Sequence, residues 1–188
     1  DWLERFLREQ PGNTVVLSGR NRPKSDLMRA AVGSGLNVLV DKPWIVEFDD
    51  FPKLEELFRE ADLRDVLAWD MMTERHEVTS QLQRELIRRR DIFGDWQTGS
   101  ESNPALAIES VHCLKKLVAG RPLVRPWWWF DYDISGESIA DVGTHLADLA
   151  MWFIAPDEAI DSDRDIRLLA AERWPVMLAE TQFAEVTG

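Results

Sequence analysis

Residues 14–43 read TVVLSGRNRPKSDLMRAAVGSGLNVLVDKP, and this stretch decides the fold class. Residues 14–17 form a short β-branched run that is typical of a buried strand. Residues 25–34 carry apolar side chains at helical spacing, and Gly35 follows where helices commonly end. Residues 38–40 repeat the buried-strand pattern. A strand, a helix and a second strand in this order predict a parallel βαβ unit with a right-handed crossover.

The βαβ pattern continues downstream. Apolar residues at i, i+3, i+4 and i+7 predict a second helix over residues 54–61, and residues 66–69 predict a third strand. We therefore expect an α/β fold in which residues 1–72 are the C-terminal half of a Rossmann-like parallel sheet. Residues 73–188 are expected to be part of an α+β domain for substrate binding or oligomerisation.

The second part of the chain has a different character. Residues 73–90 predict a long charged helix, and residues 106–132 predict mainly strands and loops. Residues 136–153 predict a clear helix, and the tail from 174 to 186 is ambiguous. The aromatic run at residues 127–130 favours packing, with a sugar-stacking platform as the alternative.

Composition excludes several classes of protein. The 188 residues include 22 Lys+Arg against 34 Asp+Glu, and the net charge of −12 lacks the basic footprint of nucleic-acid binding. No apolar run approaches the ~18 residues of a membrane helix, so we expect no membrane segment. The single cysteine, Cys113, excludes an internal disulfide and favours a reducing, cytoplasmic location.

A dinucleotide fingerprint is expected in half a doubly wound sheet, and it is missing from this sequence. The G-x-G sequence at residues 33–35 ends a helix and leads into a strand, which is the reverse of the context that cradles a pyrophosphate. The chain opens at Asp1 without a methionine, and we expect it to be a piece of a longer protein. We expect the phosphate-binding turn upstream of Asp1, and weak or no dinucleotide binding by the 188 residues alone.

Lys42 is the first candidate for chemistry. It lies just past the carboxyl end of a predicted parallel strand, where open α/β sheets bind ligands. A lysine held there beside apolar walls can act as an acid or a base, or donate a hydrogen bond to a substrate hydroxyl. The alternative is an ordinary loop lysine paired with Asp41.

The second candidate set lies on the predicted helix over residues 136–153. Asp141, His145 and Asp148 follow one another at i, i+4 and i+7, on a different stripe from the apolar residues. Either carboxylate could orient His145 as a base. A solvated helix face with an incidental histidine is one alternative. A metal site is another, although no cysteine or second histidine cluster supports it.

Residues 21–43 and 136–148 together resemble the Gfo/Idh/MocA oxidoreductases, the family of glucose–fructose oxidoreductase and inositol dehydrogenase. The first stretch is similar to the family pattern T-P-N-x-x-H…A-A…G-x-H-V-L-x-E-K-P, without gaps. The second is similar to G-G-x-x-x-D-x-G-x-H-x-x-D. The resemblance covers most of the chain from Val15 to Phe153.

The resemblance implies an oxidoreductase that depends on NAD or NADP and transfers hydride to or from a sugar, a polyol or a related hydroxy compound. Lys42 would polarise the reacting hydroxyl, His145 would take its proton, and Asp141 would orient the imidazole. Asn21, Asp41 and Lys42 match positions that line the cofactor. The family also implies a homo-oligomer.

Some residues depart from the family pattern. Gly19-Arg20 replaces the usual Thr-Pro, Lys24 replaces a histidine, and Asp41 replaces a glutamate. The first two departures leave open a non-catalytic relative that is used for binding or assembly. A metal-assisted hydrolase or isomerase built on Asp141, His145 and Asp148 is a further alternative.

Overall fold

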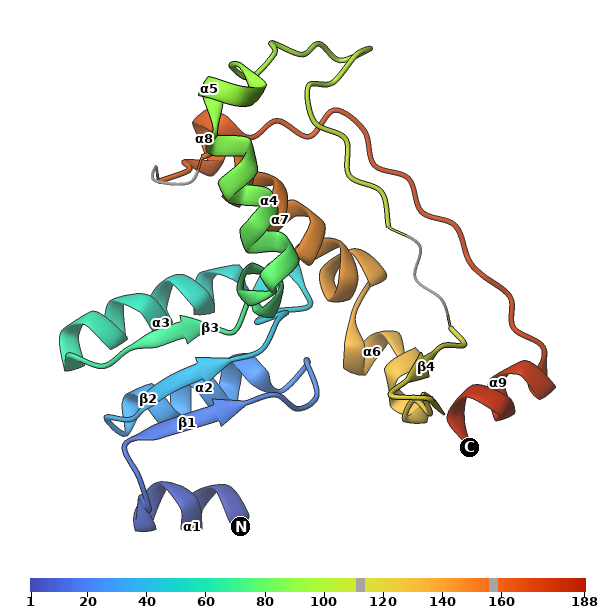
Figure 1. Ribbon diagram of the computed structural model, residues 1–188. Coiled ribbons are helices and arrows are strands. Elements are labelled where there is room, and N and C mark those ends of the chain that lie inside the picture. The colour runs from blue at the N-terminus through green and yellow to red at the C-terminus, as the bar shows by residue number, and fades with distance from the viewer. Residues whose placement is uncertain (111–113, 156–158) are drawn as a thin grey trace. The chain divides into compact units, whose positions relative to one another are not determined.

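A computed structural model describes residues 1–110, 114–155 and 159–188 of the chain (Figure 1). Cys113 lies outside the described residues. Contacts between residues divide the chain into two compact units. The first unit consists of residues 1–76 and 128–145, and the second consists of residues 77–127 and 146–188.

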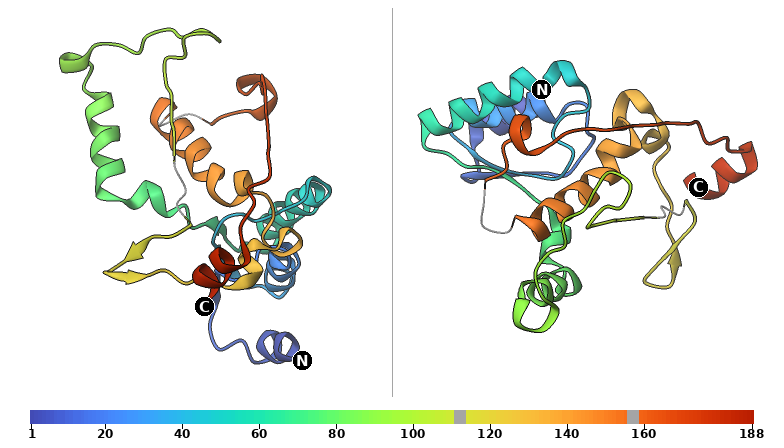
Figure 2. Two further views of the ribbon diagram at one scale, coloured as in Figure 1. Left: turned by 90° about the vertical axis from the view of Figure 1, so that its right-hand side faces the viewer. Right: turned by 90° about the horizontal axis from the view of Figure 1, so that it is seen from above.

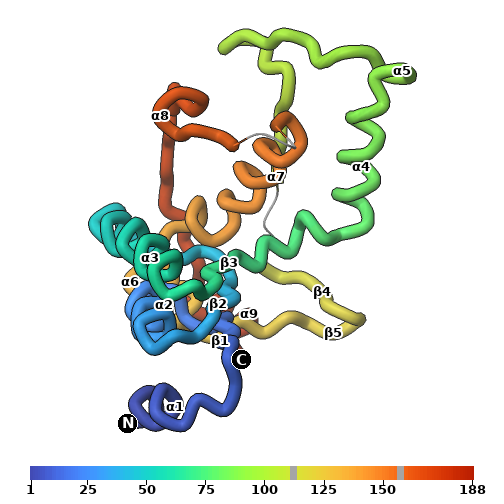
Figure 3. The backbone as a smooth tube through the Cα atoms, turned by 90° about the vertical axis from the view of Figure 1, so that its left-hand side faces the viewer, coloured from blue at the N-terminus to red at the C-terminus, as the bar shows by residue number. Residues whose placement is uncertain are grey.

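A parallel sheet is the framework of the first unit. Its strands β1 (Thr14–Leu17), β2 (Asn37–Val40) and β3 (Ala68–Asp70) lie in the order β1-β2-β3. Helices α2 (Lys24–Gly33) and α3 (Phe51–Arg64) connect successive strands, as Figure 3 shows along the backbone. The predicted α/β fold with parallel βαβ units is therefore confirmed.

The core of the first unit lies on one face of this sheet. Val38 and Val40 of β2 point into it, where α2 and α3 supply the other buried side chains. On the opposite face Val16 and Trp69 are exposed. The core residues are Met28, Ala31, Val32, Leu36, Val38, Val40, Leu57 and Ala61. Helix α1 (Trp2–Glu9) packs Phe6 and Leu7 against the same cluster.

The third strand begins two residues later than the predicted 66–69, because the backbone amides of residues 66 and 67 make other hydrogen bonds at the end of α3. The helix ends at Asp65, which has a left-handed backbone, and the Val66 amide then donates to the carbonyl of Ala61. The amide of Leu67 donates to the side chain of Asn37. Short helix η1 (Phe48–Asp50) precedes α3.

The predicted continuous helix over residues 73–90 is wrong. A 3-10 turn, η2 (Thr73–His76), ends at Glu77, whose extended backbone separates it from α4 (Val78–Arg88). A further turn, α5 (Arg90–Phe93), follows. The division between the two units falls at this break, with η2 in the first unit and α4 in the second.

The predicted helix over residues 136–153 also begins later than expected. Helix α6 (Tyr132–Ser135) ends at Gly136, and the next helix starts as a π turn, η4 (Ile139–Gly143), that runs into α7 (Thr144–Ile154). Gly136 has φ +79°, and a Cβ there would lie 2.9 Å from Cγ1 of Val46. Ile139 is 73% exposed, so it does not belong to the buried stripe that the sequence predicted.

The second unit has a small antiparallel hairpin of β4 (Leu117–Val118) and β5 (Arg121–Pro122) (Figure 2). Helices α8 (Ser162–Asp165) and α9 (Glu180–Thr187) complete its described elements. The Arg125 amide donates to the carbonyl of Val186 and so ties α9 to this region. The aromatic run that follows forms the 3-10 turn η3 (Trp127–Phe130). Among the described residues, no helix is both long enough and apolar enough to cross a bilayer.

Candidate active site

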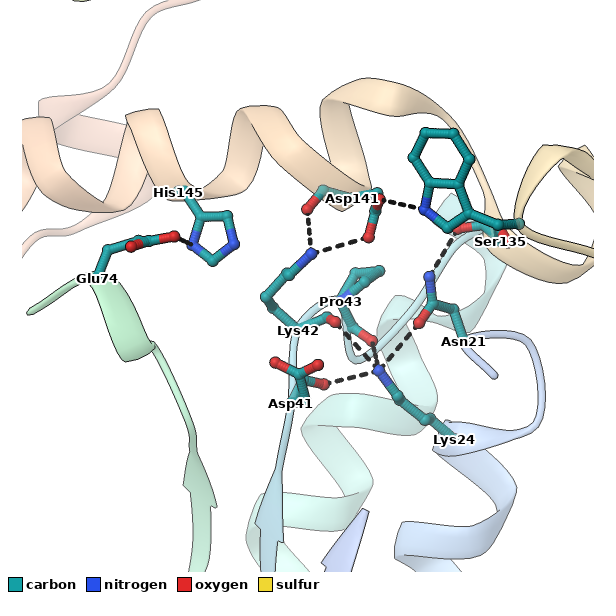
Figure 4. Close-up of polar contacts among 10 residues, drawn as sticks. Asn21, Lys24, Asp41, Lys42, Pro43, Glu74, Ser135, Asp141 and His145 are labelled. Atoms are coloured by element: carbon teal, nitrogen blue, oxygen red, sulfur yellow. Dashed lines mark hydrogen bonds and ion pairs between the residues drawn. The ribbon is translucent and has the colours of Figure 1, made fainter. Parts of the chain in front are cut away.

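Lys42 and Asp141 meet inside the first unit (Figure 4). Lys42 follows β2, and Asp141 lies in the π turn η4. Lys42 Nζ lies 2.8 Å from Oδ1 of Asp141 and also donates to its backbone carbonyl. Both side chains are 18% exposed. An ion pair that is largely withdrawn from water is screened less than a surface pair, so it fixes both side chains more firmly.

The second carboxylate oxygen of Asp141 is also occupied. Trp129 Nε1 donates to Oδ2 at 3.2 Å. The sequence favoured a packing role for Trp129 and did not assign it to the site. The one available signal was chemical, because a buried indole N–H needs an acceptor and a carboxylate is a strong one.

His145 lies one helical turn after Asp141 and is 15% exposed. Its Nδ1 atom is 3.6 Å from Oε1 of Glu74. That nitrogen is buried and makes no hydrogen bond within the described part of the chain. The sequence predicted Asp141 or Asp148 as the partner of His145. In the structure Asp141 is held by Lys42 and Trp129, and the carboxylate beside His145 belongs to Glu74 of η2.

Glu74 was missed because residues 73–90 were predicted to be one long charged helix. The break at Glu77 turns η2 into a separate element, and Figure 4 shows the Glu74 side chain pointing to the imidazole. A break of this kind has no reliable local signal, since glutamate is a good helix former.

Asp148 lies on α7 and is only 6% exposed. The predicted polar stripe of Asp141, His145 and Asp148 is therefore not a solvated helix face. The π turn changes the register between the first and later residues of the helix. In residues 1–110, 114–155 and 159–188, no three His, Cys, Asp or Glu side chains come together as a possible metal site.

Lys24 is a buried lysine beneath the loop that carries Lys42. It is 1% exposed, and its Nζ atom donates to Oδ1 of Asn21 at 3.0 Å. It also donates to the backbone carbonyls of Asp41 at 2.9 Å, Lys42 at 3.1 Å and Pro43 at 3.3 Å. Burial lowers the pKa of Lys24 from 10.5 to about 8, although the nearby Asp41 carboxylate opposes this shift.

Asn21 links the loop after β1 to helix α6. Its Nδ2 donates to the carbonyl of Ser135 at 2.8 Å, while its Oδ1 accepts from Lys24. The side chain is 9% exposed. Both polar ends of the amide therefore have protein partners, and any contact of Asn21 with a cofactor would use its remaining N–H.

The polar groups at this edge of the sheet fit the nicotinamide end of a dinucleotide. Lys42 and Asp41 follow the carboxyl end of a parallel strand, the position at which doubly wound sheets hold such ligands. Two of the three Lys42 ammonium hydrogens have acceptors on Asp141, which leaves one for a ligand oxygen. The half-buried Asp41 carboxylate adds an acceptor for a hydroxyl or an amide.

Residues 82–188 match the family model described as "Putative oxidoreductase C terminal domain". The chain belongs to the Gfo/Idh/MocA oxidoreductases. The resemblance that the two sequence stretches indicated is therefore confirmed. A search of curated proteins gave no match.

Solved structures agree with this family. A crystal structure of a protein from Parabacteroides merdae, described as a "putative oxidoreductase", is 42% identical over 100% of this chain, with a TM-score of 0.91. GenD2 from gentamicin A biosynthesis, solved with NAD, is 17% identical over 81% of the chain, with a TM-score of 0.60. The WlbA dehydrogenase of Bordetella pertussis, solved with NADH and UDP-GlcNAcA, is 15% identical over 81%, with a TM-score of 0.53. The latter two show a shared fold alone.

The chain spans less than half of these relatives. It covers 43% of the Parabacteroides merdae chain, 39% of GenD2 and 43% of WlbA. The chain is therefore comparable with only part of each of these proteins.

Proposed function

We propose that the whole protein is an oxidoreductase that depends on NAD or NADP and acts on a hydroxyl group of a sugar, a polyol or a related compound. The observation that carries the proposal is the Lys42–Asp141 ion pair, which lies one helical turn from His145. Family membership supports the reaction class, and the NADH and UDP-GlcNAcA bound to WlbA support a sugar-like substrate.

In this proposal residues 1–72 contribute to the nicotinamide-binding domain, and residues 73–188 contribute to the substrate domain. Lys42, Asp41 and Asn21 would lie against the cofactor. A bound nicotinamide supplies hydride acceptance or donation.

Lys42 would bind the reacting oxygen. Its ammonium keeps one hydrogen that Asp141 does not accept, and that hydrogen can be donated to a substrate hydroxyl or carbonyl oxygen. Asp141 holds the ammonium in place through its carboxylate and its backbone carbonyl. Trp129 in turn fixes the Asp141 carboxylate, so the side chains of Asp141 and Trp129 together determine where the Lys42 nitrogen lies.

His145 would take the proton of the substrate hydroxyl at Nε2. This assignment follows from the position of Glu74, because a carboxylate beside Nδ1 favours a proton on that nitrogen and leaves Nε2 as the acceptor. The imidazolium that forms would be stabilised by the same carboxylate. Glu74 therefore takes the orienting role that the sequence gave to Asp141, while Asp141 serves Lys42.

The test is hydride transfer by the whole protein. Wild-type protein is assayed with NAD and with NADP against glucose, myo-inositol and UDP-GlcNAcA, and nicotinamide absorbance is recorded. Turnover with at least one of these compounds is expected, together with its loss in Lys42→Ala and His145→Ala. Lys53→Ala is the matched control, because Lys53 is 41% exposed and pairs with Asp50 away from this site.

Unchanged turnover in both site variants would contradict the assignment of these residues. Lack of turnover with every compound and both cofactors would favour the non-catalytic alternative. The choice between NAD and NADP, self-association and a cytoplasmic location stay predictions that this assay, sedimentation and cell fractionation address in turn.

A further inference from the structure

Lys24 lies under the proposed active site and takes no part in the chemistry described above. It is the first residue of α2, and its ammonium is directed towards the end of β2 (Figure 4). Lysine is rarely buried to this extent unless its charge is paired. Here the hydrogen-bond acceptors are an amide oxygen and three backbone carbonyls. A buried charge that is held by neutral groups needs an explanation.

The three carbonyls belong to consecutive residues, Asp41, Lys42 and Pro43. They are the residues that leave β2 and present the Lys42 side chain. Because all three oxygens face one cation, the backbone is held on both sides of Lys42. An extended strand cannot point three successive carbonyls at one atom, since they alternate in direction. The ammonium therefore selects the turned conformation of this loop.

The fourth acceptor connects Lys24 to the other side of the site. Asn21 Oδ1 accepts from Lys24, and Asn21 Nδ2 donates to the carbonyl of Ser135. Ser135 immediately precedes Gly136, whose turn leads into η4 and Asp141. One ammonium is therefore hydrogen-bonded to the segment that carries Lys42, and through Asn21 to the segment that leads to Asp141.

We infer that Lys24 is a positioning residue, whose ammonium holds residues 41–43 in the conformation that brings Lys42 to Asp141 and to the substrate hydroxyl. The link to the substrate rests on the proposed function. The link to the Lys42–Asp141 contact does not, and it can be measured without any substrate.

Loss of the positive charge on Lys24 is expected to loosen the loop. A charged donor makes stronger hydrogen bonds than a neutral amine and offers three hydrogens in place of two. The charged groups that act on Lys24 are Asp41 and Asp141, which favour its charged form, and Lys42, which opposes it. Because burial outweighs them, the charge is lost as pH rises through about 8.

The first test uses the indole N–H of Trp129 as a reporter, since it donates to Asp141 and so senses the Lys42 contact. The resonance is assigned in ¹H–¹⁵N spectra of the whole protein with Trp129→Phe. Lys24→Met is expected to shift it in the direction that Lys42→Ala does. Lys53→Met, the matched control on α3, is expected to leave it in place. A folded Lys24→Met protein with an unmoved Trp129 resonance would overturn the inference.

The second test needs no variant that loses the buried charge. In wild-type protein the Trp129 resonance is expected to titrate with a midpoint near pH 8, and in Lys24→Arg this step is expected to disappear, because arginine stays charged. A step that survives in Lys24→Arg would belong to another group and would overturn the inference. The absence of any step in wild-type protein would overturn it as well.

The third test concerns turnover. Lys24→Met is expected to lower kcat by about 10- to 100-fold with little change in KM, because misplacement of a reacting group by about 1 Å costs rates of that order. Lys24→Arg is expected to recover part of this loss. If Lys42→Ala leaves turnover unchanged, the role that the proposed function gives to Lys42 fails, while the Trp129 reporter still decides the role of Lys24. If Trp129 responds to Lys42→Ala but not to Lys24→Met, the inference fails and the proposed function stands.

Discussion

Lys42 Nζ and Asp141 Oδ1 lie 2.8 Å apart although 99 residues separate them in the sequence. The contact joins the carboxyl end of a parallel strand to the π turn that begins a helix. Neither segment alone would make a site, because Lys42 needs an anion to fix its long side chain and Asp141 needs donors for its carboxylate.

Asp141→Asn keeps the size of the side chain and removes its charge. The Lys42 ammonium would then lose its ionic partner, and we expect kcat to fall by about 10- to 100-fold, because its nitrogen is less firmly held near the reacting oxygen. Steady-state kinetics of the whole protein measure this effect. Asp133→Asn, at an exposed site in α6, is the matched control and is expected to keep wild-type kinetics.

Glu74→Gln tests the partner of His145. The amide keeps the shape of the side chain but removes the charge that would stabilise an imidazolium, so we expect kcat to fall by about tenfold. The control is Glu77→Gln, three residues away at the extended junction before α4. Equal kinetics for the two variants would show that Glu74 does not assist His145.

The buried charge of Lys24 predicts how stability changes with pH. Between about pH 8 and 10.5 the unfolded chain holds a proton on Lys24 that the folded chain has lost, so the free energy of unfolding rises with pH in this window. Below about pH 8 both states are protonated, and the folded state bears the full cost of the buried charge. The gain across the window is at most about 3–4 kcal/mol, since one pKa unit corresponds to ~1.4 kcal/mol.

Lys24→Met removes this dependence. Unfolding midpoints of the whole protein are recorded from neutral to alkaline pH, and above about pH 8 the midpoint of wild type is expected to rise relative to that of Lys24→Met. The unfolding midpoints of Lys53→Met should change with pH as those of wild type do between about pH 8 and 10.5. Hydrogen bonding to Asp50 raises the pKa of Lys53, and this exposed lysine keeps its charge there. A constant difference between wild type and Lys24→Met at every pH would contradict the predicted titration.

Gly136→Ala is expected to destabilise the turn before η4. The backbone there has φ +79°, a region that L residues rarely adopt, and the added Cβ would meet Val46 Cγ1 at 2.9 Å. We expect a loss of about 1–3 kcal/mol in the free energy of unfolding. Gly12→Ala is the matched control, because a Cβ at Gly12 has no neighbour within 4 Å. Similar losses in both variants would contradict a special requirement at Gly136.

Local patterns predicted the first two strands and the helix between them well. The β-branched runs of β1 and β2 and the apolar spacing of α2 depend on neighbours a few residues away, and these features appear where expected. Lys42 was selected as a candidate for the same reason, since its position after a strand is a local property. The later start of the helix after Gly136 was not predicted. The turn at Gly136 packs closely against Val46, and this contact exists only in the folded chain.

The partners within the site could not be predicted from sequence. The pairing of Lys42 with Asp141 joins segments whose separation no periodic pattern bridges. Glu74 lies in a segment that the sequence pattern predicted as part of one continuous helix. Lys24 is buried, although lysine is a residue type usually found on the surface. In each case the position of the side chain is determined by a polar partner that is distant in the sequence, and composition and spacing do not indicate such a partner.

The most direct test of the central claim is deuterium transfer from substrate carbon to nicotinamide by the whole protein. On the compound that gives turnover in the panel above, we predict that wild type transfers deuterium from the carbinol carbon and that Lys42→Met lowers the rate by at least about 100-fold. Lys53→Met should keep the wild-type rate. A Lys42→Met protein that transfers deuterium as fast as wild type would contradict the account.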